Sequence, residues 1–228
     1  MPAVIARLLL QTLLWLVVMA LLLFGAAGTL AWTRAWIFLA ESAALGFAAG
    51  FWLAASDPAL LRERLRAPVQ RGQPVADKLL TSALLLASCL WLVLIGLDAG
   101  RYRWSAMPVA LAVAGALAMP VFVWMSCLVF RANSFAAPVV KLQESRGQQV
   151  ASTGPYRYVR HPMYASAILY FLSVPLLLGS WWGLAAMPVL AGLLCLRILI
   201  EERTLVAGLP GYADYAARVR YRLVPGLW

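Results

Sequence analysis

The sequence predicts an all-α, polytopic membrane helix bundle of about six transmembrane helices. Of the 228 residues, 64% are hydrophobic and only 12% are charged, and the mean hydropathy is +0.82. A typical soluble domain carries roughly twice that share of charged residues. The apolar residues are also gathered in long runs, several of them near the roughly 20 residues that an α-helix needs to cross a bilayer.

Six apolar runs are the expected spans. They are residues 8–30, 35–55, 79–97, 106–130, 162–178 and 181–200. Only Gly179 and Ser180 separate the last two runs, so these must form an antiparallel C-terminal helical hairpin. Pro108 and Pro120 fall within the fourth run, where proline is typical of a kink. The first run is longer than the apolar region of a signal peptide, so we expect it to be retained.

The basic residues predict which side of the membrane each loop faces. The chain has 19 lysines and arginines and a net charge of +10. With six spans, only Arg34, Arg101 and Arg103 lie on the side opposite the termini, while loops 56–78 and 131–161 are rich in basic residues. Cytoplasmic loops are enriched in this way, so we expect both termini and both long loops in the cytoplasm, with the cell inner membrane as the location. The distribution favours a membrane surface over nucleic acid as the partner of the positive charge.

The first spans offer few groups for chemistry. Glu41 lies within the second run, where an acid is costly and often functional. Arg34 is close to it in sequence, so we expect an ion pair at the membrane interface. The cysteines, Cys89, Cys127 and Cys195, lie in separate apolar runs, which suggests neither a disulfide nor a metal site. With a single histidine in the chain, a zinc site is not expected.

A polar, basic and aromatic stretch, residues 154–164 (GPYRYVRHPMY), contains that histidine and ends where the fifth run begins. Pro162 favours an extended conformation at His161 and is well placed as the first residue of the following helix. We therefore expect the imidazole at the mouth of the fifth span. A basic and aromatic membrane anchor is the alternative interpretation of this stretch.

A second polar cluster, Arg197 with Glu201 and Glu202, lies at the end of the last span. Arg197 and Glu201 are four residues apart and share one helix face. Because the last two spans form a hairpin, His161 enters the membrane at the level where Glu201 leaves it. The two clusters are thus expected to converge on one cytoplasmic cofactor pocket. The alternative is an ordinary ion pair within the helix.

These motifs resemble the isoprenylcysteine carboxyl methyltransferase family. The resemblance rests on GPY at 154–156, RHPMY at 160–164, the pair Glu201-Glu202 and GYADY at 211–215. The related phosphatidylethanolamine N-methyltransferases share the paired glutamates. The likeness covers residues 131–228, a methyltransferase-like region of cytoplasmic loop, hairpin and tail, and leaves 1–130 as N-terminal transmembrane helices.

The resemblance implies S-adenosylmethionine as the methyl donor, bound without a Rossmann domain, and the chain has no Gly-x-Gly-x-x-Gly motif. It implies an S-adenosylmethionine-dependent methyltransferase of the protein-S-isoprenylcysteine O-methyltransferase type, which acts on a lipophilic substrate. The cofactor-binding residues that it implies are Gln148, Gln149, Val150, Ala151, Tyr156, His161, Pro162, Met163, Tyr164 and Glu201. It places Arg197 near the substrate. Ser166 stands where the family usually has glycine, and its side chain is expected to narrow the pocket.

The charges of the donor suggest further roles. Glu201 can pair with the ammonium group, and Arg160 or His161 can meet the carboxylate. Tyrosine rings can stack on adenine or face the sulfonium. Orientation and desolvation should dominate methyl transfer, and Glu202 is the candidate if a base is needed.

Other functions stay open. One is N-methylation of a phospholipid or another amine. A second is NADPH-dependent reduction of a sterol or enone, although the paired glutamates suit a ribose phosphate poorly. A third is a membrane scaffold or small transporter without enzymatic activity. The expected partners are membrane lipids and a lipophilic or lipid-modified substrate, with no nucleic acid. The acceptor and the oligomeric state are not predicted.

Overall fold

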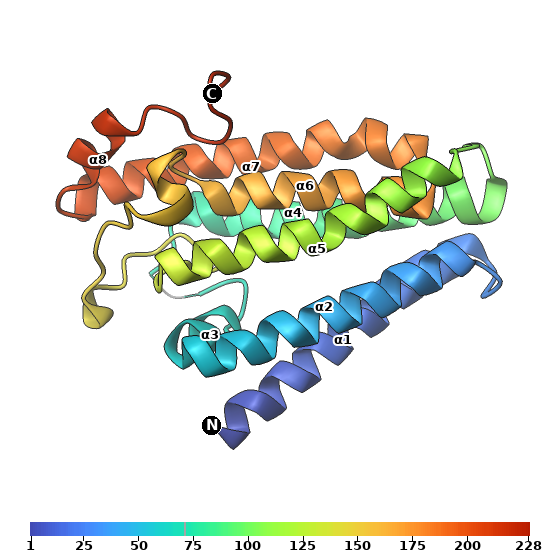
Figure 1. Cartoon of the computed structure of the whole chain (residues 1–228), viewed down its shortest axis with the longest axis horizontal. Coiled ribbons are helices and arrows are strands. Elements are labelled where there is room, and N and C mark those ends of the chain that lie inside the picture. Colours follow the sequence, from blue (N-terminus) through green and yellow to red (C-terminus); the bar gives the residue numbers. More distant parts are fainter. Residues whose placement is uncertain (71) are drawn as a thin grey trace.

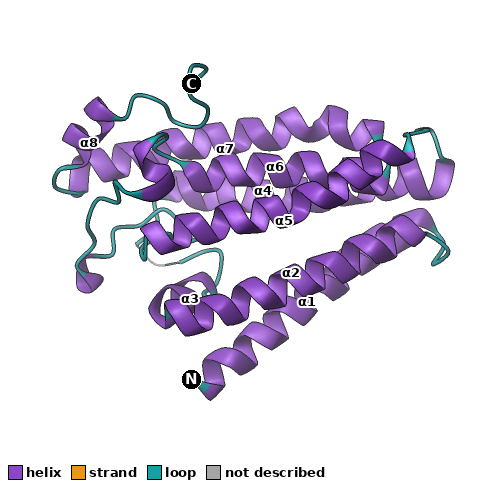
Figure 2. Ribbon diagram, viewed as in Figure 1, coloured by secondary structure: helices purple, strands orange, loops and turns teal. Residues whose placement is uncertain are grey.

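The computed structural model describes residues 1–70 and 72–228. Arg71, one of the basic residues counted in loop 56–78, lies outside the described residues. Throughout the described chain the regular structure is helical, which confirms the predicted all-α class (Figure 2). The elements are α1 (Pro2–Ala27), α2 (Thr33–Ser56), α3 (Pro58–Arg64), α4 (Val75–Ile95), the π-helix η1 (Gly96–Tyr102), α5 (Val109–Ala132), the 3-10 turns η2 (Glu144–Arg146) and η3 (Gly154–Arg157), α6 (Pro162–Leu178), α7 (Trp181–Gly208) and α8 (Tyr212–Arg218).

Helices α1, α2, α4 with η1, α5 and α7 are long and apolar enough to cross a membrane. Helix α6 is shorter, at 17 residues, but lies in the bundle beside α5 and α7. The helices run up and down, so both termini, α3, the loop after α5 and α8 gather at one end (Figure 1). We call this the basic end. The chain is a multi-pass bundle, as predicted.

The predicted hairpin of the last two spans is present. Gly179 ends α6 with φ of 85°, a left-handed conformation that glycine adopts without strain. Ser180 then caps α7, because its hydroxyl accepts a hydrogen bond from the amide of Gly183. Pro120 lies inside α5 as expected, whereas Pro108 precedes the helix as its N-cap. Proline fits there because a helix start leaves its first amides unpaired anyway.

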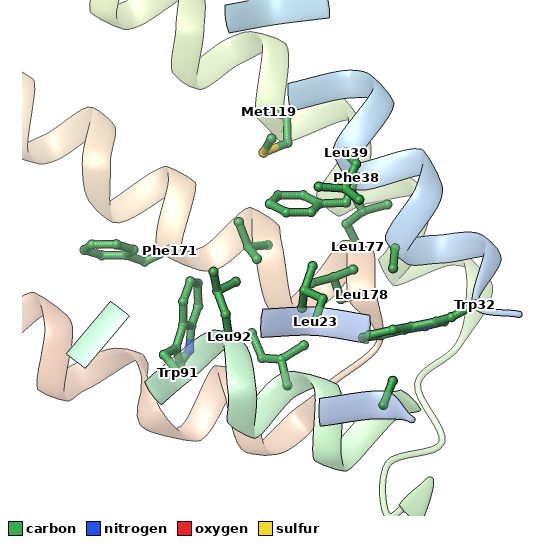
Figure 3. Packing of buried hydrophobic residues seen from close by; sticks show 14 of the residues in the cluster. Leu23, Trp32, Phe38, Leu39, Trp91, Leu92, Met119, Phe171, Leu177 and Leu178 are labelled. Carbon is green, nitrogen blue, oxygen red and sulfur yellow. The ribbon is translucent and has the colours of Figure 1, made fainter. Parts of the chain in front are cut away.

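Small residues allow the helices to approach closely. A Cβ atom added at Gly115 of α5 would lie 2.7 Å from the carbonyl oxygen of Ser173 on α6. Close approach at glycine stabilises helix pairs in lipid, where apolar burial alone gives little driving force. The main core packs side chains of α1, α2, α4, α5, α6 and α7 together (Figure 3), and Trp91 donates a hydrogen bond from its indole to the carbonyl of Gly183.

The end of the bundle opposite the basic end is fixed by Asp98. This residue is fully buried, and its Oδ2 accepts hydrogen bonds from the hydroxyls of Ser105 and Ser180, each at 2.6 Å. The contact joins η1 to the start of α7. The carboxylate therefore helps to set where the last helix begins.

The expected ion pair between Glu41 and Arg34 is wrong. Arg34 donates instead to the carbonyl of Met107, and Glu41 forms no ion pair within the described residues. Glu41 is seven residues further along α2, which places it roughly 10 Å from Arg34 along the helix axis. Glu41 and Arg34 are close in sequence, but their side chains do not interact.

The shared position of the termini makes the topology testable. In a background without the native cysteines, Gln70→Cys and Ser145→Cys should react with an impermeant thiol reagent only from the cytoplasmic side. Arg103→Cys, at the other end of the bundle, should react only from outside. Labelling of Gln70→Cys or Ser145→Cys in intact cells would contradict the assignment.

Candidate functional site

An open cavity lies at the basic end of the bundle, between the end of α5, the loop after it, the start of α6 and the end of α7. Its walls are both apolar and polar. The polar and aromatic lining residues are Asn133, Phe135, Lys141, Gln148, Gln149, Tyr156, Arg160, His161, Tyr164, Glu201, Thr204, Tyr212 and Tyr215.

The structure brings nearly all of the predicted cofactor-binding residues around this one cavity. Those that line it are Gln148, Gln149, Val150, Ala151, Tyr156, Arg160, His161, Met163, Tyr164 and Glu201. Pro162 does not; it is buried as the first residue of α6. Arg197 and Glu202 do not line the cavity either. The hairpin accounts for this convergence, because it sets the start of α6 beside the end of α7.

Glu201 presents a carboxylate to the cavity. Its Oε2 accepts a hydrogen bond from the hydroxyl of Tyr164 at 2.6 Å and lies 4.0 Å from Nδ1 of His161. Its Oε1 has no hydrogen-bond partner among the described residues, and the side chain is 28% exposed. One carboxylate oxygen is thus held by the helix pair while the other remains available to a ligand.

Glu202 does not line the cavity, and its carboxylate contacts two arginines and the histidine. Its carboxylate accepts hydrogen bonds from Nε of Arg160 at 2.6 Å and Nε of Arg222 at 2.8 Å, and it lies 3.2 Å from Nε2 of His161. Successive residues of a helix point roughly 100° apart, so Glu201 and Glu202 serve different surfaces. The structure therefore does not place Glu202 where the expected base would act.

Arg160 anchors the C-terminal tail. Its Nη1 donates to the carbonyls of Val219 and Arg220, and its backbone amide donates to the carbonyl of Tyr221. The amide of His161 donates to the carbonyl of Arg222. Although Arg160 borders the cavity, much of its donor capacity is directed to the tail, and His161 is the better placed of the two to meet a ligand.

Arg197 does not form the ion pair with Glu201 that was the alternative interpretation of this cluster. Its expected position near the substrate stays a prediction. Arg197 donates from Nε to Oδ1 of Asp77 on α4 at 2.8 Å, and from Nη2 to the carbonyl of Pro138. Asp77 is fully buried, and its Oδ2 accepts from the amide of Val140. Arg197 thus pairs with the carboxylate of Asp77 on α4, and not with that of Glu201, which lies one turn away on its own helix. The network holds residues 138–140, part of which lines the cavity.

Ser166 does not narrow the cavity as expected. It is fully buried on the face of α6 that meets α5, where its hydroxyl donates to the carbonyl of Met163 and lies 3.3 Å from the hydroxyl of Ser126. Its side chain fills space between two helices, so the cavity keeps its shape regardless of this departure from the family pattern.

Sequence reasoning missed the tyrosines of α8. Tyr212 and Tyr215 line the cavity; Tyr215 donates to the carbonyl of Tyr156 at 2.8 Å, whereas the buried hydroxyl of Tyr212 has no partner among the described residues. Burial raises the pKa of Tyr156 and Tyr212 above the usual range and that of Tyr215 to about 12, so all three are neutral near pH 7. Their spacing in GYADY, three residues apart on one helix face, was the available signal.

The part of the chain that surrounds the cavity is similar to a known protein family. Residues 110–209 match the phospholipid methyltransferase family. This family lies in the same membrane methyltransferase superfamily as the isoprenylcysteine carboxyl methyltransferases. No curated protein matches the chain. The matched segment runs from α5 to the end of α7 and holds most of the cavity wall, so the similarity to membrane methyltransferases falls on the candidate site.

The buried pair between Asp77 and Arg197 gives a stability prediction. Asp77→Asn should lower the free energy of unfolding by about 3–5 kcal/mol, because it leaves a buried guanidinium without its charge partner. Thermal unfolding of the detergent-purified protein measures this. In the double variant Asp77→Asn/Arg197→Met no unpaired charge remains, so most of the loss should be recovered. Equal stability of Asp77→Asn and the wild type would contradict the assigned pair.

Proposed function

We propose that this chain is a membrane methyltransferase that binds S-adenosylmethionine in the cavity and acts on a lipophilic acceptor. The observation that carries the proposal is the carboxylate of Glu201. It keeps a free oxygen among tyrosine and histidine side chains, inside the segment that matches the phospholipid methyltransferase family. The resemblance of the GPY, RHPMY and Glu-Glu motifs supports the same reaction class.

The residues around the cavity suit the polar ends of this donor. Glu201 would pair with the ammonium group through its free oxygen. His161 and the amides of the loop after α5 would meet the carboxylate. The rings of Tyr156, Tyr164 and Tyr212 offer faces for the adenine and the sulfonium. The unpartnered hydroxyl of Tyr212 would gain a hydrogen-bond partner when such a ligand is bound.

When bound, S-adenosylmethionine supplies an electrophilic methyl group on its sulfonium. The sulfonium loses its positive charge as the methyl leaves, so the residues of this chain contribute by orienting the reactants and by excluding water. The carboxylate of Glu202 is engaged by Arg160, His161 and Arg222, so it is not free to act as a base. The site therefore suits an acceptor that arrives with a free electron pair, either a carboxylate or a neutral amine.

Two acceptor classes agree with this chemistry. The match of residues 110–209 favours N-methylation of a phospholipid amine. The motifs in residues 154–164 and the tail favour carboxyl O-methylation of the isoprenylcysteine type. Reduction with NADPH is disfavoured, because Glu201 would repel the ribose phosphate from the polar part of the cavity.

Binding of S-adenosylhomocysteine tests the role of Glu201. Glu201→Gln should weaken it by about 2–4 kcal/mol, because the ammonium group then enters a partly desolvated site without its counter-charge. Tyr164→Phe removes only the hydrogen bond that orients Glu201 and should cost about 1 kcal/mol. Calorimetry on the purified protein gives both values.

The exposed Glu144 of η2 offers a matched control. Glu144→Gln makes the same change of charge outside the cavity and should leave the affinity unchanged. Wild-type affinity of a folded Glu201→Gln variant would reduce Glu201 to an ordinary residue at a helix end.

A further inference from the structure

Helix α3 packs against the bundle at the basic end, directly after α2 (Figure 1). The side chain of Asp57 caps it by accepting a hydrogen bond from the amide of Leu60. Leu60 and Leu61 are buried against α1, α2 and the end of α5, in a cluster that includes Leu8 and Phe130. This short amphipathic helix is thus held firmly at the level where the spans leave the bilayer.

Arg64, the last residue of α3, carries a cation without a counter-charge. Its guanidinium lies over the ring of Phe130, 4.5 Å from the centroid, and Nη1 donates to the carbonyl of Ala136 at 2.9 Å. Among the described residues no carboxylate lies within ion-pair distance of it, whereas the neighbouring Glu63 pairs with Lys141 and Arg66. A partly buried cation in this state is costly unless a partner arrives.

Burial lowers the pKa of Arg64 to about 10, so the group stays charged near pH 7 despite its surroundings. Of the donors that a guanidinium offers, the described residues engage one. The remaining N–H groups form a planar fork suited to two oxygens of a single phosphate or carboxylate.

The guanidinium stands directly behind one wall of the cavity. Ala136, whose carbonyl it holds, is a lining residue, and Met163 both lines the cavity and packs against the cluster under α3. Glu201 reaches the same cavity from α7, which lies on the other side of α5 and α6 from α3 in Figure 1. The cavity therefore has an acidic group on its α7 side and an unpaired cation beyond its α3 side.

We propose that Arg64 binds the anionic group of the methyl acceptor, an oxyanion that the acceptor carries at the membrane interface. This deepens the proposed function and rests on it. Glu201 serves the donor, and Arg64 holds the acceptor from the lipid-facing side so that its nucleophile points into the cavity. The oxyanion is either the phosphate of a phospholipid, whose amine is then the nucleophile, or the carboxylate of a prenylated cysteine, of which Arg64 would hold one oxygen while the other faces the donor. Both present an oxygen to the guanidinium.

The test measures lipid binding to the detergent-purified full chain. The phosphate pair of probes is phosphatidylethanolamine and a diacylglycerol with the same acyl chains. The carboxylate pair is N-acetylfarnesylcysteine and its methyl ester, neither of which has an ammonium group. We call the member of each pair that carries the oxyanion the anionic probe and the other the neutral probe. Arg64→Gln should weaken binding of the anionic probe of one pair by about tenfold or more, and leave the neutral probe within twofold. The pair that responds identifies the oxyanion.

Arg62→Gln is the matched control. Arg62 lies on the same helix, is exposed, and its loss changes the net charge equally. It should leave all four affinities within twofold. Equal losses in Arg62→Gln and Arg64→Gln would overturn the proposal, because general surface attraction would then explain the binding. So would unchanged binding in Arg64→Gln, or an equal loss for neutral and anionic probes.

Affinity for S-adenosylhomocysteine separates this proposal from the one on which it rests. It should be the same in the wild type, Arg64→Gln and Arg62→Gln. A wild type that binds the anionic probe through Arg64 but never binds S-adenosylhomocysteine would overturn the methyltransferase proposal alone. If Arg64→Gln does not fold, Arg64→Lys replaces it; the lysine lacks the planar fork, so an anionic probe should bind at least about threefold more weakly. Wild-type affinity of Arg64→Lys would overturn the role of the guanidinium.

Discussion

Three segments that are distant in sequence meet at the carboxylate of Glu202. Arg160 and His161 approach it from the start of α6, and Arg222 approaches it from the C-terminal tail. Each contact involves a charged or ionisable group near the membrane, where an unpaired charge is costly. The carboxylate thus fixes the tail and the start of α6 to α7. The orientation of His161 toward the cavity follows from this junction.

The junction also frees the neighbouring residue. Because Glu202 takes the arginines, Glu201 is left with one tyrosine hydroxyl and a free oxygen on the cavity. Asp77 has a similar effect from α4, since it takes Arg197 and leaves no arginine to neutralise Glu201 within the helix. Two structural carboxylates therefore keep a third available for a ligand. Because Glu202 and Asp77 bind the nearby arginines, the carboxylate of Glu201 stays accessible in a strongly basic chain.

The sequence predicted the parts of this site that follow from local rules. Run lengths gave the spans, and the two-residue turn at Gly179 and Ser180 placed His161 beside Glu201. It failed where partners are distant. The spacing of Arg197 and Glu201 offered an ion pair within the helix as an alternative, yet the partner of Arg197, Asp77, lies 120 positions away in sequence. Likewise, no local pattern in the sequence indicates that the C-terminal tail contacts Arg160. Such contacts depend on how helices pack and not on periodicity.

The central claim is that the cavity beside Glu201 holds a methyl donor, and one titration tests it most directly. Purified wild-type protein would be titrated in parallel with S-adenosylhomocysteine and with NADPH under identical conditions. The account predicts saturable binding of S-adenosylhomocysteine with one site per chain, and no binding of NADPH. Saturable binding of NADPH without binding of S-adenosylhomocysteine would contradict it and would favour a membrane reductase.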